Sequence, residues 1–203
     1  MLLRLLDPTV DDDHSVRIDG IPIGRVNRDV LRQRLITIPQ DPSFLPEGHT
    51  VKENVDLFDE ATDEECIEVL EQTNLAALLK DGIHGTFVTE TLSHGHQQLF
   101  SFARAVLRKK VRARSGNVSG GILIMDEPNS KVDQDTDAAM QDIVKTEFGN
   151  YSVIVISHRL ETVMNICDRV VVLSDGRVVE QGSPNILAKT QGSWFGGLLA
   201  AAK

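Results

Sequence analysis

Acidic and imidazole side chains follow two apolar stretches of the sequence at the points where strands are expected to end. Asp126 and Glu127 come directly after residues 122–125, and His158 comes after residues 153–157. Continuous apolar runs are typical of parallel strands covered on both faces, and the carboxyl ends of such strands border the ligand crevice. Adjacent carboxylates repel each other unless they share a cation, and Mg²⁺ with phosphate oxygens would relieve that repulsion. The pattern therefore favours a site for Mg²⁺ and phosphate oxygens at this edge of the sheet.

Each of these residues also has a purely structural interpretation. Asp126 could cap the turn that follows the strand, Glu127 could be a solvated side chain, and His158 could be a hydrogen-bonded interior histidine. The apolar run before Asp126, the segment ending at Asp133 after it, and the position of His158 at a strand end beside Ser157 favour the functional interpretation.

The elements that must hold these residues alternate between strands and helices. Such alternation predicts an α/β fold with a mainly parallel sheet and a single domain. The longest helix is expected at residues 62–79, which open with three acidic residues that suit a helix N-terminus. Strands are expected at residues 16–20, 36–38, 122–125 and 152–156, other helices at 30–35, 97–109, 136–147 and 160–166, a helix end at 1–6, and a hairpin at 170–179.

Composition excludes several classes of protein. The chain has 203 residues and a formal net charge of −9, which argues against a nucleic-acid partner. Its one basic cluster, residues 108–114, is interpreted as a solvated helix end. Cys66 and Cys167 lie far apart, so neither a disulfide framework nor a zinc site is expected, and a reduced cytosolic setting fits better. The longest apolar runs are far shorter than the ~20 residues of a membrane-spanning helix.

Four short motifs stand in the sequence at residues 38–42, 92–98, 122–133 and 155–159. They resemble the motifs of ABC-transporter ATPase domains, in the order found in that family. The sequences at residues 38–42 and 93–95 are most similar to those of the second ATPase domain of multidrug-resistance-associated (C-subfamily) exporters. The resemblance covers essentially the whole chain and implies a P-loop NTPase-like ABC ATPase fold over residues 1–203, with a helical subdomain at about 45–110. The motifs are a Q-loop at residues 38–42, a signature loop at 92–98, a Walker B strand with its D-loop at 122–133, and a switch-histidine loop at 155–159.

The resemblance implies a role for each residue at the strand ends. Asp126 would help to hold Mg²⁺, and Glu127 would be the general base that positions the attacking water. His158 would reach the γ-phosphate of ATP. Gln40 would contact both the metal and the water, and would couple the site to a transmembrane part. ATP and Mg²⁺ are thus the implied cofactors.

The signature loop implies a partner. Ser93, Gly95 and His96 stand at the start of a helix whose N–H groups and dipole suit an anion. In the family this loop, with a D-loop residue equivalent to Asp133, contacts the ATP bound by a second ABC ATPase domain, so that hydrolysis belongs to a dimer. The other implied partners are the transmembrane domains of an exporter, which would place this chain at the cytoplasmic face of a membrane.

The sequence also departs from the family pattern. The loop Gly-x-x-x-x-Gly-Lys-Ser/Thr, which cradles the phosphates, does not occur in the 203 residues. By the resemblance, Met1 falls inside the helix that follows this loop, so we expect a fragment that is unstable by itself and does not bind ATP productively. His94 and His96 replace glycine and glutamine in the signature loop, and an imidazole cannot present an amide's donor and acceptor together.

Two alternatives to an exporter ATPase remain open. The first is a soluble ABC-type ATPase that is not coupled to transport. Such proteins carry coiled-coil insertions or tandem ATPase domains, and this sequence shows neither heptads nor a duplicated domain. The second is a non-catalytic remnant, or a partner module that only lends its signature loop to another domain's ATP.

Overall fold

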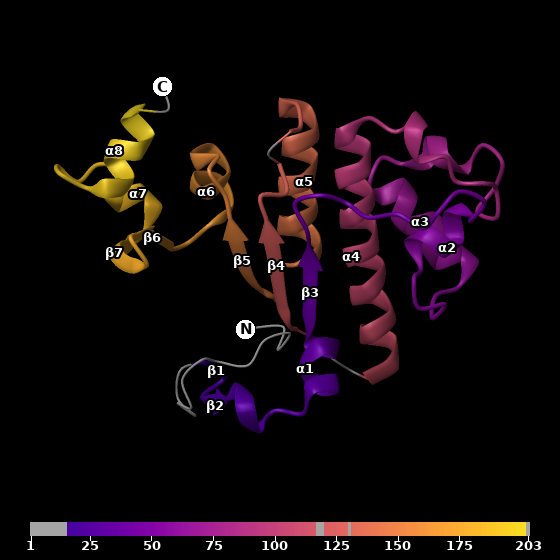
Figure 1. Cartoon of the computed structure of the whole chain (residues 1–203), viewed down its shortest axis with the longest axis horizontal. Coiled ribbons are helices and arrows are strands. Elements are labelled where there is room, and N and C mark those ends of the chain that lie inside the picture. The colour runs from indigo at the N-terminus through magenta and orange to yellow at the C-terminus, as the bar shows by residue number, and fades with distance from the viewer. Residues whose placement is uncertain (1–15, 117–119, 130, 202–203) are drawn as a thin grey trace.

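A three-stranded parallel sheet lies at the centre of the molecule (Figure 1). The computed structural model describes residues 16–116, 120–129 and 131–201. Within them β3 (Leu35–Ile38), β4 (Ile122–Asp126) and β5 (Ser152–Ile156) pair in that order, and both pairings are parallel. The three strands point the same way, so the segments that follow them leave the sheet at one edge. The prediction of an α/β fold with a parallel sheet is confirmed.

Helices pack beside this sheet. The longest is α4 (His94–Gly116), which runs along β3 and packs against α5 (Gln134–Glu147) (Figure 1). The other elements are β1 (Arg17–Ile18), β2 (Ile21–Pro22), α1 (Arg28–Arg34), α2 (Val51–Val55), α3 (Asp63–Gln72), α6 (Leu160–Ile166), β6 (Val170–Ser174), β7 (Arg177–Gly182), α7 (Pro184–Leu187), α8 (Trp194–Ala201) and 3-10 turns at Ile23–Arg25, Ala76–Leu79 and Thr89–Thr91.

Two helices next to α4 begin with reciprocal side-chain caps. At α2 the Thr50 hydroxyl accepts from the Glu53 amide at 3.1 Å, and the Glu53 carboxylate accepts from the Thr50 amide at 2.7 Å. Thr62 and Glu65 form the same box at the start of α3. Because each box pairs two N–H groups that the helix leaves unpaired, these starts are fixed by local sequence.

The helix predicted at residues 62–79 is wrong in its second half. The α3 helix ends at Gln72, and Asn74 then adopts a left-handed conformation with φ 60°. Asparagine tolerates this conformation better than most residues, and it reverses the chain after a helix. The Ala76–Leu79 segment is a separate 3-10 turn. The residues predicted as a helix end at 1–6 lie outside the described part of the chain.

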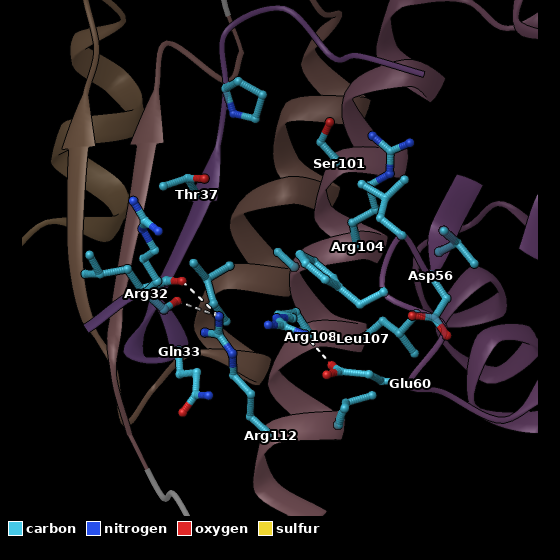
Figure 2. A pocket seen from close by; sticks show the side chains of 18 of the residues that line it. Arg32, Gln33, Thr37, Asp56, Glu60, Ser101, Arg104, Leu107, Arg108 and Arg112 are labelled. Carbon is cyan, nitrogen blue, oxygen red and sulfur yellow. Dashed lines mark hydrogen bonds and ion pairs between the residues drawn. The ribbon is translucent and has the colours of Figure 1, made fainter. Parts of the chain in front are cut away.

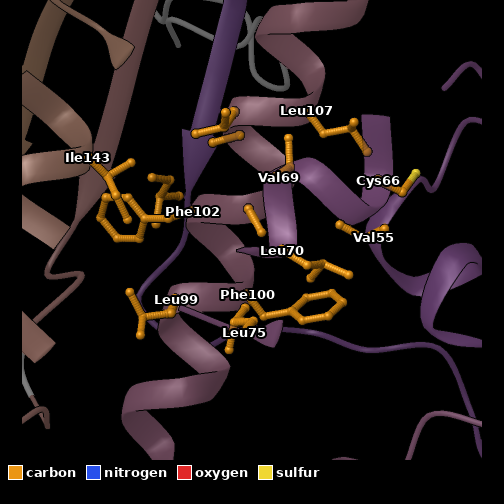
Figure 3. Close-up of a cluster of buried hydrophobic side chains, with 14 of the residues drawn as sticks. Val55, Cys66, Val69, Leu70, Leu75, Leu99, Phe100, Phe102, Leu107 and Ile143 are labelled. Atoms are coloured by element: carbon orange, nitrogen blue, oxygen red, sulfur yellow. The ribbon is translucent and has the colours of Figure 1, made fainter. Parts of the chain in front are cut away.

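The apolar core surrounds α4 on two sides (Figure 3). Phe102 faces Ile143 of α5, whereas Phe100 faces Leu70 and Leu75 of the α3 region. Phe100 is fully buried, and its ring centroid lies 5.0 Å from that of Phe87. Because both sides of α4 are buried, the helix packs against the sheet on one side and against the α2 and α3 region on the other.

The prediction that β5 is a buried strand is wrong for the described residues. Ile154 is 40% exposed and Ile156 is 53% exposed. Among the described strands β5 pairs only with β4, and the hairpin of β6 and β7 forms a separate sheet. Strand burial depends on what covers each face and edge, which the apolar pattern of a single strand does not state.

The basic cluster at residues 108–114 is not a solvated helix end. Four of its side chains form ion pairs with glutamates of other segments, and a fifth, Arg112, donates to the backbone carbonyls of Arg32 and Leu35. The cluster therefore joins α4 to the segments on both sides of it. The ion pairs are Arg108 with Glu60, Lys109 with Glu147 (2.9 Å), Lys110 with Glu68 (2.9 Å) and Arg114 with Glu65 (2.7 Å).

The predicted hairpin near the C-terminus is confirmed. β6 and β7 pair antiparallel, and the turn between them has φ 50° at Asp175 and φ 73° at Gly176. Two consecutive positive φ values belong to the turn type that matches the twist of a hairpin, and an Asp-Gly pair suits it. In the described residues, no helix is long and apolar enough to cross a membrane.

Candidate functional site: the carboxyl edge of the sheet

Three side chains from three different strands meet at one edge of the sheet. Gln40 follows β3, Glu127 follows β4 and His158 follows β5. The Glu127 carboxylate oxygen Oε2 lies 3.3 Å from the amide nitrogen of Gln40 and 3.2 Å from Nδ1 of His158. Gln40 and Glu127, 87 positions apart in the chain, are thus in contact. Sequence analysis placed Glu127 and His158 at strand ends that border one crevice, and the two side chains lie together there.

The backbone aims the Glu127 side chain. Glu127 has φ 42°, and its amide donates to the carbonyl of Ile156 in β5 at 2.8 Å. A left-handed conformation is uncommon for a residue with a long side chain, and it persists only where the surrounding structure holds it. The turn directly after β4 therefore directs this carboxylate toward the ends of the neighbouring strands.

Asp126 lies beside this group as the last residue of β4. It is exposed and stands opposite Ile156 in the strand register. Gln40 donates its amide N–H to Glu127, which leaves its amide oxygen as an acceptor. Carboxylate and amide oxygens are the donors that Mg²⁺ prefers, and this ion usually keeps several waters and binds substrate phosphates. The donor set fits Mg²⁺, although the described residues contain no cluster of three or more His, Cys, Asp or Glu side chains able to hold a metal.

Two further residues position this edge, and sequence reasoning missed both. The amide of Gln98 on α4 is buried and donates to the backbone carbonyl of Gln40. Asn129, two residues after Glu127, is also buried. A glutamine within the apolar stripe of a helix was the available signal for Gln98, whereas the role of Asn129 depends on partners far away in the sequence.

Asn129 is the centre of a buried polar network. Its amide donates to Asp137 Oδ1 at 2.9 Å and to Thr162 Oγ1 at 2.5 Å. Its backbone carbonyl accepts from Arg159 at 3.0 Å. These bonds join the segment after β4 to α5, α6 and the loop that carries His158. Asn129 thereby fixes the two strand-end loops relative to each other.

Replacing Asn129 with alanine is expected to lower the free energy of unfolding by about 1–3 kcal/mol, because buried acceptors lose their donor. The urea midpoint should fall while the slope of unfolding free energy against urea stays unchanged. Asn165→Ala is the matched control, since its amide bonds Gln141 at 3.2 Å on the surface. Its effect should stay within about 0.5 kcal/mol. Equal effects of the two replacements would contradict the buried network.

The signature-loop residues form a second group at the start of α4. The Ser93 hydroxyl lies 2.9 Å from Nδ1 of His96 and accepts from the His96 amide at 3.2 Å. Gly95 is buried against Thr136, and a β-carbon there would come within 3.1 Å of the Thr136 hydroxyl oxygen. Glycine at 95 therefore permits the close approach of α4 and α5.

Asp133 acts on this second group through Thr136. Its carboxylate accepts from the Thr136 amide at 2.9 Å and from the Thr136 hydroxyl at 2.7 Å. These hydrogen bonds hold the pKa of the Asp133 carboxyl below its ordinary value. Asp133 is thus the N-cap of α5, and it orients the threonine that contacts Gly95.

Comparison with known proteins decides the family. The family described as "ABC transporter" matches residues 1–130. The chain belongs to the ABC transporter family. It is 51% identical, over 100% of its length, to ABC transporter FGM5 of Gibberella zeae, and 44% identical, over 98%, to ABC-type transporter braE of Annulohypoxylon truncatum. The chain spans about a seventh of the length of these relatives, 14% of each.

Two further similarities bear on subfamily and fold. ATP-binding cassette sub-family C member 2 of Rattus norvegicus is 37% identical over 89% of the chain, which is 11% of that protein. A solved bacterial Atm1-family ABC exporter with ATP bound matches with a TM-score of 0.80 and 26% identity, over 99% of this chain and 34% of that one. The resemblance to an ABC nucleotide-binding domain, drawn from the four motifs, is therefore confirmed.

Proposed function

We propose that this chain supplies the hydrolytic part of an ATPase domain in an ABC exporter. The observation that carries the proposal is the convergence of Gln40 and His158 on one oxygen of Glu127, at the carboxyl edge of a parallel sheet. Membership in the ABC transporter family supports ATP as the substrate and export as the coupled process. Residues 1–203 would then be a partial ABC ATPase domain, with its helical subdomain at about 45–110.

Each residue at the edge has a role that its geometry allows. Glu127 Oε2 is held by Gln40 and His158, so its other oxygen is free to accept a proton from the attacking water. Gln40 keeps its amide oxygen as an acceptor, and when both ring nitrogens of His158 are protonated, Nδ1 donates to Glu127 while Nε2 can donate to a phosphate oxygen. When bound, Mg²⁺ would neutralise phosphate charge, and Asp126 with Gln40 would hold it.

The second group would act on another domain's nucleotide. Ser93 directly precedes the 23-residue helix α4, and Gly95 and His96 lie in its first turn, where a helix N-terminus favours an anion. We propose that they contact the ATP of a second ABC ATPase domain, with Asp133 holding the loop through Thr136. The transmembrane domains of the exporter would be the other partner, at the cytoplasmic face of the membrane.

The sequence lacks the phosphate-binding loop, so the test must supply one. The segment of the Gibberella zeae transporter that is 51% identical to this chain can be replaced by this chain, because the two align over the whole 203 residues. In both the chimera and the unchanged Gibberella zeae transporter, which is the parent, the second ATP site is inactivated. The measured hydrolysis then comes from the site that contains the exchanged segment. We expect this chimera to hydrolyse ATP within about tenfold of the matched parent. A chimera that folds and reaches the membrane but has no ATPase activity would support a non-catalytic remnant instead.

The second candidate function is a partner module that only supplies its signature loop to another domain's ATP. It remains open because Ser93 and Gly95 lie at the start of α4 whether or not the chain binds ATP. Mixing the chain with an intact ABC ATPase domain that carries an inactive signature loop distinguishes the two. Restored hydrolysis in the mixture, without hydrolysis by the chimera, would favour lending alone.

A further inference from the structure

Arg159 directly follows His158 in the chain, and its side chain bonds the segment that follows Glu127. The Nη1 atom of Arg159 donates to the backbone carbonyl of Asn129 at 3.0 Å and to that of Val132 at 3.4 Å. One nitrogen thus bridges two carbonyls of the segment that leads from β4 to α5. The loop that carries His158 is therefore attached to the segment that carries Glu127.

A buried carboxylate restrains the same guanidinium. Asp137 of α5 is buried, and its Oδ2 lies 3.6 Å from Nη2 of Arg159. Its Oδ1 accepts from the side chain of Asn129 at 2.9 Å, so two of the groups that Arg159 contacts are bonded to each other. A planar guanidinium presents its donors in a fixed fork, and a buried carboxylate that lost its cation would be left unpaired. Three acceptors thus define the position of the Arg159 side chain.

His158 is less restrained than its neighbour. Its side chain is 61% exposed, and its Nδ1 lies 3.2 Å from Oε2 of Glu127. An exposed ion pair contributes little and does not fix a ring by itself. The backbone beside His158 is better defined, because the Arg159 amide donates to Oγ of Ser157 at 3.0 Å. The position of the His158 ring therefore depends on where Arg159 holds this loop.

We propose that Arg159 is a positioning residue that keeps the His158 ring against the Glu127 carboxylate. Arg159 is one residue from His158, and the carbonyl that it bonds on Asn129 is two residues from Glu127. The attachment therefore fixes both loops close to the groups that meet at the sheet edge. Its consequence for ATP hydrolysis rests on the proposed function, in which a misplacement of about 1 Å can cost roughly a hundredfold in rate.

A guanidinium bonds backbone carbonyls elsewhere in the chain as well. Arg112 on α4 donates to the carbonyls of Arg32 and Leu35, and so attaches this helix to the start of β3 (Figure 2). That attachment lies at the opposite end of β3 from the segment with Gln40, and its effect is expected on stability. The attachment made by Arg159 differs because both of its ends lie within two residues of a group at the sheet edge.

The test follows the imidazole C–H signals of His158 by NMR in the ¹³C-labelled 203-residue chain. The variant His158→Gln identifies these signals among those of the six histidines. Glu127→Gln removes the charge beside the ring, so it should shift the His158 signals in the otherwise unsubstituted chain. In an Arg159→Met background the ring leaves the carboxylate, and the same replacement should cause less than about half of that shift.

Arg169→Met is the matched control for the loss of an arginine. Arg169 is exposed, and its Nη2 bonds the side chain of Gln181 at 2.9 Å in the hairpin region. In this background the shift caused by Glu127→Gln should be the same as in the unsubstituted chain. The proposal is overturned if Glu127→Gln leaves the His158 signals unshifted in the unsubstituted chain, or shifts them equally in the Arg159→Met background.

Arg159→Lys is the second variant, for the case that Arg159→Met does not fold. An ammonium keeps a positive charge opposite Asp137, but it has no fork that could bond the carboxylate and both carbonyls together. The shift caused by Glu127→Gln should again be smaller than in the unsubstituted chain, and an equal shift would overturn the proposal.

ATP turnover by the chimera provides a second readout. Arg159→Met should lower turnover about tenfold or more and change the KM for ATP less than about twofold. In a His158→Ala background the same replacement should lower turnover no further, because there is no ring to position. A further tenfold loss there would show that Arg159 acts independently of His158, and would overturn the proposal. An inactive unsubstituted chimera would count against the proposed function alone, since the NMR comparison still decides whether Arg159 positions His158.

Discussion

Replacing Glu127 with glutamine is expected to lower the ATP turnover of the chimera by roughly 10²–10⁴-fold. Glutamine keeps the shape of the side chain and can still hydrogen-bond Gln40 and His158, but its amide cannot accept a proton from water. The loss should therefore appear in turnover at saturating ATP, while nucleotide binding stays close to that of the unsubstituted chimera. Steady-state ATPase rates and equilibrium nucleotide binding in membrane vesicles measure the two effects separately.

Glu71→Gln is the matched control for this prediction. Glu71 is an exposed glutamate of α3, far along the chain from the strand ends, and the same change of one oxygen to nitrogen should leave turnover unaffected. If Glu127→Gln retained more than about a tenth of the turnover, a general-base role for Glu127 would be contradicted. A parallel loss of binding and turnover would instead indicate that the replacement disrupts the loop.

Replacing Phe100 with alanine is expected to have the largest effect on stability. Its side chain is fully buried between Phe44, at a ring-centroid distance of 5.5 Å, and Phe87, at 5.0 Å. Removing a buried phenylalanine costs about 3–5 kcal/mol, because transfer free energy is lost and a cavity remains. Native domains are stable by only about 5–15 kcal/mol, so the variant should be largely unfolded under mild denaturing conditions. Urea unfolding followed by circular dichroism measures the change.

Phe58→Ala provides the control with the same change in composition. Phe58 is 63% exposed and lies against the Arg108 guanidinium, a surface contact worth about 0.5–1 kcal/mol. A loss after Phe58→Ala as large as that after Phe100→Ala would mean that the core around α4 does not hold the chain together.

The site at the sheet edge was predictable because it follows from two local patterns. Apolar runs placed β4 and the strand carrying His158, and parallel strands bring the residues after them to one edge. The position of Gln40 came from its resemblance to a family motif rather than from periodicity. The side-chain contacts on Glu127 then required only that the three strands be neighbours, as they are.

The errors share a physical cause, which is dependence on distant partners. The sequence predicts a solvated basic cluster on α4, because its glutamate partners lie 38 to 49 residues away, as Lys109 with Glu147 and Arg114 with Glu65 show. The exposure of Ile156 depends on what lies beside β5, and the burial of Asn129 depends on Thr162, 33 residues later. The end of α3 at Gln72, two residues before the left-handed Asn74, is different, since a single asparagine in a helical pattern is a weak local signal.

We propose that this chain holds the hydrolytic groups of an ABC ATPase site, while its sequence contains no phosphate-binding loop. The most direct measurement is calorimetric titration of MgATP into the 203-residue chain and, in parallel, into the chimera, with cooperative unfolding of each checked beforehand. We predict saturable binding by the chimera and none by the chain alone, because no backbone cradle for the phosphates exists in its sequence. Saturable binding of MgATP by the folded chain alone would contradict this account.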